Sequence, residues 1–232
     1  MKTPAPRNAA SGPATRPEPA AAPKQRGRPR SFDREAALES AMEVFWERGY
    51  DAASLNDLTE AMGINPPSLY AAFGDKEQLY LAAVEMYRVK RVEELRGALA
   101  SEPTARGAIE HAMRGAATEF AKHDGPSGCL LTMSTNCSTV SEAVQATLAK
   151  KRSAARDLIR DRIAQGIAEG DVPASTDASG LTDFIMTVFA GMAMQARDGA
   201  GRKVLLGAVD NAMRAFPEVA RKAAKRKSIA AA

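Results

Sequence analysis

The sequence predicts an all-α protein, both from its composition and from the spacing of its apolar residues. Apolar residues make up 45% of the 232 residues and aromatic residues only 5%, so Ala and Met carry much of the apolar content. Stretches in which β-branched and polar residues alternate, as half-buried strands require, are nearly absent. Apolar residues recur instead at helical spacing, between residues that start and stop helices. We expect about nine helices.

The first predicted helix covers residues 33–49. Its apolar residues lie at positions i, i+3, i+4 and i+7 and so share one face: Leu38, Ala41, Met42 and Phe45. Asp33 is a suitable N-cap, because its carboxylate can accept hydrogen bonds from the first backbone N–H groups. Gly49 is a suitable stop for the same helix.

Two short helices are predicted next, at 54–62 and 65–73, with a tight turn between them. The second begins with two consecutive prolines. If Asn65 is the N-cap, Pro66 and Pro67 occupy the first two helical positions, where backbone N–H groups have no partner within the helix. The pair fits a helix–turn–helix, although an ordinary helical hairpin fits the same spacing.

The later helices are predicted to begin at 75, 104, 128, 141, 176 and 201, and the last five to end at 123, 138, 169, 197 and 216. The longest apolar run, 184–194, has 11 residues, whereas a membrane span needs about 20. The first 30 residues also lack the apolar segment of a signal peptide. We therefore expect a soluble, cytoplasmic protein without a membrane partner.

The two ends of the chain are basic, whereas its middle is acidic. Residues 1–30 hold seven Lys or Arg and one Glu, a net charge of +6, and residues 218–232 have a net charge of +4. Because the whole chain carries +4, residues 31–217 carry −6. Both ends offer little apolar surface to bury, so we expect a disordered arm at 1–30 and a disordered tail at 218–232. Basic ends favour a polyanionic partner, with improved solubility as the alternative.

Four short motifs occur in order between residues 49 and 79: G-Y-x-x-x-S, A-x-G-I, S-L-Y-x-x-F and F-G-x-K-E-x-L. With these motifs, residues 31–91 resemble the DNA-binding domain of the TetR/AcrR family of bacterial transcriptional regulators. Residues 92–217 resemble the ligand-binding and dimerisation domain of that family only in the number and length of their helices.

This resemblance implies a homodimeric repressor that places helix 65–73 in the major groove of a palindromic double-stranded DNA operator. A small, largely apolar effector would release it. The resemblance implies phosphate contacts from Ser54, Tyr70 and Lys76. The remaining DNA-binding positions that we expect on the recognition helix are Asn65, Pro66, Pro67, Ser68 and Ala71.

Charge suggests a further DNA contact. Residues 31–80 contain three Lys or Arg and ten Asp or Glu, a net charge of −7, which repels phosphate. We expect the segment RGRPR to compensate, through Arg26, Arg28 and Arg30. It resembles the core of an AT-hook, whose arginines lie in the minor groove of A·T-rich DNA. Nonspecific contact with phosphate is the alternative.

The C-terminal region allows two further expectations. The residues predicted to line an effector pocket are Met113, Phe120, Cys129, Met133 and Phe184. The last two helices are predicted to form a four-helix bundle with a second copy of the chain, because their apolar faces exceed what one subunit needs. The residues predicted at this interface are Phe184, Val188, Gly191, Met192, Leu205 and Val209.

The two cysteines, Cys129 and Cys137, would lie about 12 Å apart on one continuous helix, too far to form a disulfide. We expect buried thiols, with a thiol-based redox sensor as the alternative. The histidines near them do not have the spacing of a zinc site, so we expect no metal and no cofactor. Motifs of the common enzyme classes are absent, so we predict no enzymatic activity. An architectural DNA-binding protein without ligand control is the competing class.

Overall fold

The structure is a computed structural model, and it describes residues 1, 32–122 and 124–219. These residues form nine α-helices, one short 3₁₀ helix and no strand, which confirms the all-α class. The elements are α1 (Arg34–Ala52), α2 (Leu55–Met62), α3 (Pro66–Phe73), α4 (Lys76–Ala100), α5 (Ala105–Phe120), α6 (Leu130–Met133), η1 (Ser134–Asn136), α7 (Glu142–Glu169), α8 (Ala178–Arg197) and α9 (Arg202–Ala215). The predicted arm, apart from Met1, and residues 220–232 of the predicted tail lie outside the described residues.

Helices α1 and α3 each begin at a residue whose side chain accepts hydrogen bonds from the first backbone N–H groups of the helix. The Asp33 carboxylate accepts hydrogen bonds from the backbone N–H groups of Glu35 and Ala36, at 2.9 and 3.3 Å. The Asn65 side chain accepts one from the Ser68 N–H at 2.9 Å, with prolines at the first two positions of α3. Both predicted caps are therefore confirmed, and the two prolines lie where they remove no helical hydrogen bond.

Helix α1 continues past its predicted stop. Its backbone breaks at Gly49, where φ is +78° and ψ is 169°, and a further turn then extends it to Ala52. The left-handed region is one that residues with a Cβ rarely enter. Gly49 therefore produces a kink inside α1.

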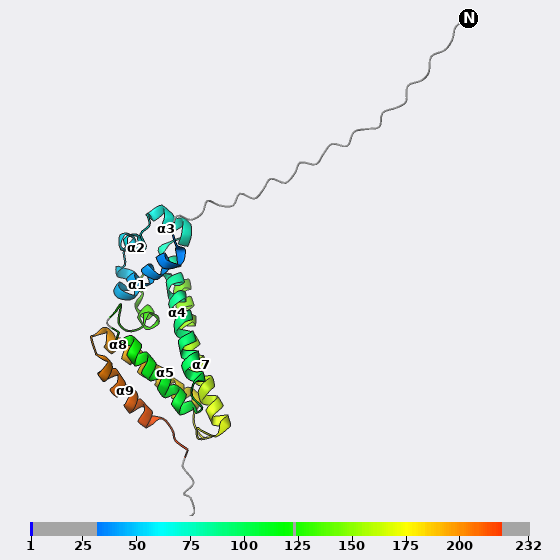
Figure 1. The fold of residues 1–232 in the computed structure, drawn as a ribbon, viewed down its shortest axis with the longest axis vertical. Helices are drawn as coiled ribbons and strands as arrows, with labels where there is room; N and C mark the ends of the chain where they lie inside the picture. The colour runs from blue at the N-terminus through cyan, green and yellow to red at the C-terminus, as the bar shows by residue number, and fades with distance from the viewer. Residues whose placement is uncertain (2–31, 123, 220–232) are drawn as a thin grey trace, which may run out of the picture. The chain divides into compact units, whose positions relative to one another are not determined.

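Two hydrophobic cores lie along the described residues, and α4 contributes to both. The first joins α1–α3 to the start of α4, and its buried side chains include Phe45, Leu58, Leu69, Leu79 and Tyr80. The second joins α5 and α7–α9 to the end of α4, with Ile109, Met113, Ile163, Ile185 and Leu205 fully buried. Figure 1 shows α1–α3 gathered at the start of α4, while α5, α8 and α9 lie toward its other end.

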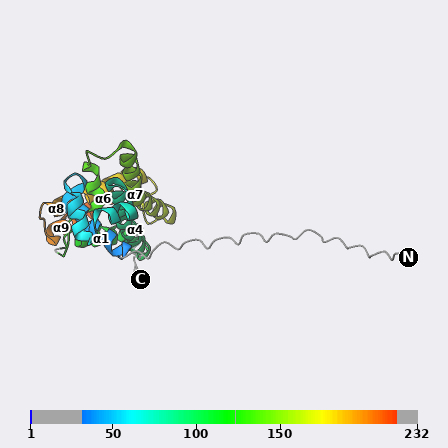
Figure 2. The same cartoon turned by 90° about the horizontal axis from the view of Figure 1, so that it is seen from above.

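The predicted helix at 128–138 is wrong. Only α6 and η1 form there, followed by extended backbone at Cys137. The hydroxyls of Ser134 and Thr135 donate to the carbonyl groups of Leu131 and Thr132, at 2.7 and 2.9 Å, and such bonds compete with helix propagation. The estimate of a separation along one helix therefore does not apply to the two cysteines. Figure 2 shows α6 near α1 and α7, and it contacts both.

None of the helices within the described ranges is long and apolar enough to cross a membrane.

Two helical glycines, one closely packed and one exposed, should respond in opposite ways to substitution by alanine. A Cβ at Gly166 would lie 2.5 Å from the Ala105 Cβ and close to Asp171, so Gly166→Ala should destabilise the fold by about 1–3 kcal/mol. At Gly115, on exposed α5 surface, a Cβ meets nothing within 4 Å. Gly115→Ala should stabilise by about 0.5–1 kcal/mol through helix propensity. Urea unfolding of the two variants measures both effects, and equal signs would contradict the packing described.

Candidate nucleic-acid interface and effector cavity

Helix α3 presents a polar and small-residue face to solvent. Leu69 and Phe73, 0% and 7% exposed, hold its inner side in the first core. Tyr70 is 49% exposed on the other side. Exposure along this face continues through Asn65, Pro66, Pro67 and Ala71, while Ser68 is half-buried. The predicted groove-facing residues therefore share a surface, and their contacts with DNA stay a prediction.

Two cations flank α3 and rest on aromatic rings. The Lys76 Nζ lies 4.4 Å from the centroid of the Tyr50 ring, and burial lowers the pKa of this lysine. The Arg34 guanidinium lies 4.5 Å from the centroid of the Phe73 ring. Within the described part of the chain, neither forms an ion pair, so both keep their charge available to phosphate. Arg34, at the start of α1, was not among the phosphate contacts expected from the sequence.

Ser54 has a structural role as the N-cap of α2. Its hydroxyl accepts a hydrogen bond from the Asp57 N–H at 3.1 Å and donates one to the Asp57 carboxylate at 2.6 Å. The Asp57 carboxylate also accepts from the Ser54 N–H and pairs with Arg48, and these contacts lower its pKa to about 2. The predicted phosphate contact of Ser54 stays a prediction, and it would use a hydroxyl that already donates and accepts.

Many carboxylates of the N-terminal helices either accept hydrogen bonds from the backbone or lie away from α3. Five of the ten carboxylates between 31 and 80 accept hydrogen bonds from backbone N–H groups: Asp33, Asp51, Asp57, Asp75 and Glu77. Three more, Glu35, Glu39 and Glu43, line an open groove of about 660 Å³ between α1 and α4 that no residue of α3 borders. The net charge of −7 is therefore not concentrated on the face of α3.

Residues 137–141 are fastened to the N-terminal helices by side-chain contacts that we call the polar seam. The Asp51 carboxylate accepts hydrogen bonds from the backbone N–H and the hydroxyl of both Ser138 and Thr139. The Glu77 carboxylate accepts two from Ser141, at 2.7 and 2.9 Å. The Tyr80 hydroxyl lies 3.2 Å from the Cys137 Sγ and hydrogen bonds with it. Each contact joins residues more than 50 positions apart.

A second attachment comes from the end of α8. The Arg197 guanidinium donates hydrogen bonds to the carbonyl groups of Trp46, at 2.7 Å, and of Glu47. These carbonyls belong to the turn just before the kink at Gly49. Helix α8 therefore contacts α1 directly and does not depend on α4 alone for this connection.

A largely apolar cavity of about 290 Å³ lies between α4, α5, α7, α8 and the segment 129–135. Of the predicted pocket residues, Phe120 and Cys129 line it. The other three do not border this cavity: Met113 is buried in the second core, Phe184 is 39% exposed on α8, and Met133 lies outside the lining. A role of any of the five in binding an effector stays a prediction. Lining residues that sequence reasoning missed include Tyr87, Arg91, Leu95, Arg152, Ile159, Met186 and Phe189.

The predicted dimer interface is partly wrong. Met192, Leu205 and Val209 are 2%, 0% and 0% exposed in the core of their own subunit, so they cannot face a partner. Phe184 and Gly191 are exposed and Val188 is half-buried on the outer side of α8. Met194 of α8 and Val204 of α9 are also exposed apolar residues, at 44% and 56%.

In comparisons with known proteins, the N-terminal helices and the C-terminal helices match two different family profiles. A family profile described as bacterial regulatory proteins, tetR family, matches residues 37–83, and one described as a tetracyclin repressor-like C-terminal domain matches 107–216. The chain is similar to the HTH-type transcriptional repressor ComR of Escherichia coli K12, with 34% identity over 84% of this chain and 94% of ComR. It is also similar to the repressor BdcR of that strain, with 31% identity over 75% of this chain and 83% of BdcR.

Two solved structures extend the comparison. The TetR family regulator CifR, as a mutant with three cysteines replaced and in complex with a 26-bp double-strand operator DNA, is 43% identical with a TM-score of 0.78. The match covers 82% of this chain and all of that chain. A TetR regulator from Rhodococcus sp. RHA1 is 35% identical with a TM-score of 0.56, over 81% of this chain and all of that one.

The polar seam predicts a characteristic response to acid. Hydrogen bonds from Thr139 and Ser138 lower the pKa of Asp51 from 3.8 to about 2. Its contribution to stability is therefore complete above the ordinary pKa and is lost as the pH falls toward 2. Asp51→Asn should lower the urea midpoint at neutral pH and flatten its fall in that acidic range.

Urea titrations at a series of pH values measure this effect. Glu93→Gln removes an exposed α4 carboxylate that makes no hydrogen bond within the described ranges, and it should leave the profile unchanged. An Asp51→Asn profile that parallels the wild-type profile would show that the seam does not hold the segment.

Proposed function

Because the chain belongs to the TetR family of bacterial transcriptional regulators, we propose that it is a repressor that binds a palindromic operator as a homodimer. A small, largely apolar effector would release it. The observation that carries the DNA-binding role is the exposed face of α3, which Leu69 and Phe73 hold outward from the first core. The solved complex of the similar CifR with operator DNA supports the same partner for this chain.

On DNA, α3 would enter the major groove with Pro67, Ser68 and Ala71 toward the base edges. A proline and an alanine offer only apolar contact, for example with a thymine methyl group. Most of the affinity would therefore come from phosphate contacts by Arg34, Tyr70 and Lys76. The arginines of the arm at 26, 28 and 30, which lie outside the described residues, would add minor-groove contacts.

The dimer would use the outer face of α8 together with α9. Phe184, Gly191 and Met194 are exposed there in one subunit, and a second copy can cover them by packing α8 and α9 against their counterparts. Gly191 has no neighbour within 4 Å of a Cβ position, which leaves room for close approach of a partner helix. The symmetry of such a dimer requires two half-sites about one helical turn apart.

Release would begin in the cavity. A ligand there touches α4 through Tyr87 and Leu95, and the 129–135 segment through Leu131 and Thr132. Both elements continue into the N-terminal helices, α4 directly and the segment through the polar seam. To change occupancy from 99% bound to 99% free, the effector must favour the released state by about 5.5 kcal/mol.

A thiol response is a second candidate, because Cys129 lines the cavity. In CifR, two of the three replaced cysteines lie eight positions apart, which is also the spacing of Cys129 and Cys137. Cys137 is less suited to react, since burial raises its pKa and its Sγ hydrogen bonds with the Tyr80 hydroxyl. Modification of Cys129 would place an added group inside the cavity and so act as a bound effector does.

The DNA-binding role predicts a matched set of affinities. Tyr70→Ala and Lys76→Ala should each weaken binding to the upstream operator and to random DNA by about 5- to 30-fold, because phosphate contacts position without reading sequence. Lys90→Ala removes the same charge further along α4, at an exposed site, and should have no effect. Fluorescence anisotropy with 26-bp duplexes measures all three. Loss confined to operator DNA would contradict the phosphate roles.

The dimer predicts a different pair of variants. Gly191→Leu places a large side chain where the partner helix would approach, so it should yield monomers in sedimentation velocity and lose operator binding. Gly115→Leu makes the same change on the exposed side of α5 and should leave the protein dimeric. A Gly191→Leu protein that sediments as a dimer would place the interface elsewhere.

A further inference from the structure

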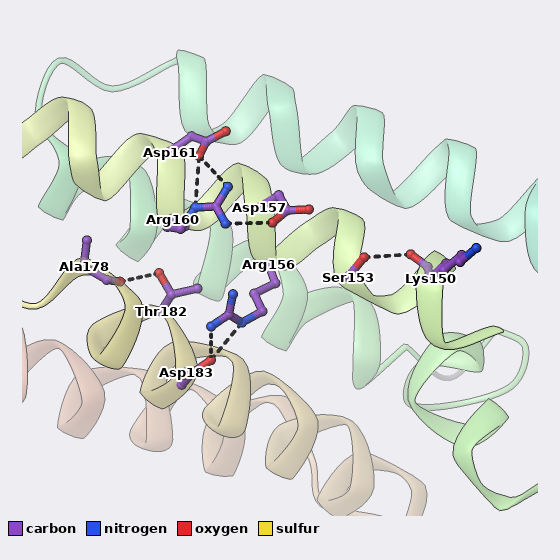
Figure 3. Close-up of polar contacts among 9 residues, drawn as sticks. All are labelled: Lys150, Ser153, Arg156, Asp157, Arg160, Asp161, Ala178, Thr182 and Asp183. Atoms are coloured by element: carbon purple, nitrogen blue, oxygen red, sulfur yellow. Dashed lines mark hydrogen bonds and ion pairs between the residues drawn. The ribbon is translucent and has the colours of Figure 1, made fainter. Parts of the chain in front are cut away.

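Helix α7 carries arginines whose charges are compensated, with one exception. Arg156 pairs with Asp183 of α8 at 2.8 Å, and Arg160 pairs with Asp157 and Asp161 at 3.1 and 3.0 Å (Figure 3). Arg162, further along, has a carboxylate of Glu169 at 3.8 Å and donates to two backbone carbonyls.

Arg152 is the exception. Its Nη1 donates a hydrogen bond to the Ser134 hydroxyl at 3.1 Å, and within residues 32–122 and 124–219 no carboxylate pairs with it. It is half-buried and lines the apolar cavity. A cation in such surroundings is costly unless an anion compensates it.

The other charged residues of the cavity wall already compensate one another. The Arg91 guanidinium pairs with Glu94 at 2.6 Å and with Glu119 at 2.7 Å. Glu119 also pairs with Lys122 at 2.5 Å, so this cluster contains two cations and two carboxylates. Neither carboxylate is therefore left over to neutralise Arg152.

A second polar group of the cavity wall lacks a partner. The Tyr87 hydroxyl lies near the Cys129 thiol and the Arg91 guanidinium, but it forms no hydrogen bond of good geometry with either. Burial raises the pKa of Tyr87 well above its ordinary value, so this phenol stays protonated and remains a donor. Tyr87 is 2% exposed, which makes the missing acceptor expensive.

The rest of the lining is apolar and the space is small. Leu95, Phe120, Ile159, Met186 and Phe189 form most of the remaining wall. A volume of about 290 Å³ lies at the lower end of the range for small-molecule sites. The cavity therefore suits a body the size of one aromatic ring or a short acyl chain.

We propose that the effector is a compact organic monoanion, a carboxylate on a small apolar body, with the carboxylate held by Arg152 and the body by the apolar wall. A guanidinium matches a carboxylate in both charge and shape, and two parallel hydrogen bonds fix its orientation. The Tyr87 hydroxyl is a further neutral donor in the wall of the same cavity. This assignment rests on the proposed function only in treating the bound molecule as an effector.

The test compares three carboxylates with their amides. Benzoate, phenylacetate and hexanoate are titrated into the full-length protein by calorimetry, each beside the amide of the same body. At least one carboxylate should bind, and its amide about tenfold or more weaker. Arg152→Met should weaken carboxylate binding by about 10- to 100-fold, the loss expected for a charged hydrogen bond. Arg156→Met removes the same charge one turn away, outside the cavity wall, and should bind as the wild type does.

The outcomes separate the two proposals. The carboxylate assignment is overturned if none of the three carboxylates binds, if the amides bind as tightly, or if Arg152→Met keeps the wild-type affinity. The carboxylate–amide comparison needs only the wild type, so it stands even if Arg152→Met does not fold. Operator binding is measured separately without ligand. A protein that binds its operator but no carboxylate loses this assignment and keeps its proposed function, whereas carboxylate binding without operator binding supports the assignment alone.

Discussion

Two carboxylates of the N-terminal helices, Asp51 and Glu77, hold the segment that forms one wall of the cavity. Asp51 lies after the kink in α1, and Glu77 lies in the first turn of α4. The hydroxyls and backbone N–H groups that they bind belong to residues 138–141, which begin three positions after the cavity-lining residues 129–135 end. The wall of the cavity and the helices that carry the DNA-binding face therefore cannot move independently without breaking hydrogen bonds to a carboxylate, which are among the stronger ones in proteins.

Local features of this fold could be predicted from sequence, because their physical cause is local. A cap needs one side chain and the N–H groups two or three positions later, so Asp33 and Asn65 could be assigned from their neighbours in the chain. The inner residues of α1 and α3 followed from helical periodicity in the same way. The helix predicted at 128–138 does not form as one helix, because serine and threonine hydroxyls there donate hydrogen bonds to backbone carbonyls and so compete with the helical N–H groups. The pattern of apolar residues does not show this effect.

Whether a residue lines the cavity, the core or the outer surface depends on which helix packs against its side of the helix. Helical periodicity does not contain that information. Met113 and Phe120 both lie on the inner side of α5, yet only Phe120 borders the cavity. On α8, Met192 faces its own subunit and Val188 lies on the outer side, although both are apolar. The net charge of residues 31–80 was also an incomplete guide to the repulsion of phosphate. It counts the Asp57 carboxylate in the same way whether that group faces phosphate or caps α2. The placement of Arg34 and Lys76 over aromatic rings needed the folded structure.

The chain contains a single tryptophan, and it lies against a residue of the cavity wall and is hydrogen-bonded to the end of α8. The Trp46 ring meets the Tyr87 ring edge to face, with centroids 4.9 Å apart, and Tyr87 forms part of the cavity wall. The Trp46 carbonyl accepts a hydrogen bond from Arg197 of α8. Indole emission depends on the polarity and the quenching groups around the ring, so a shift of Tyr87 or of α8 alters the spectrum of one fluorophore. The unlabelled protein thus carries its own signal for testing whether a change in the cavity wall reaches α1.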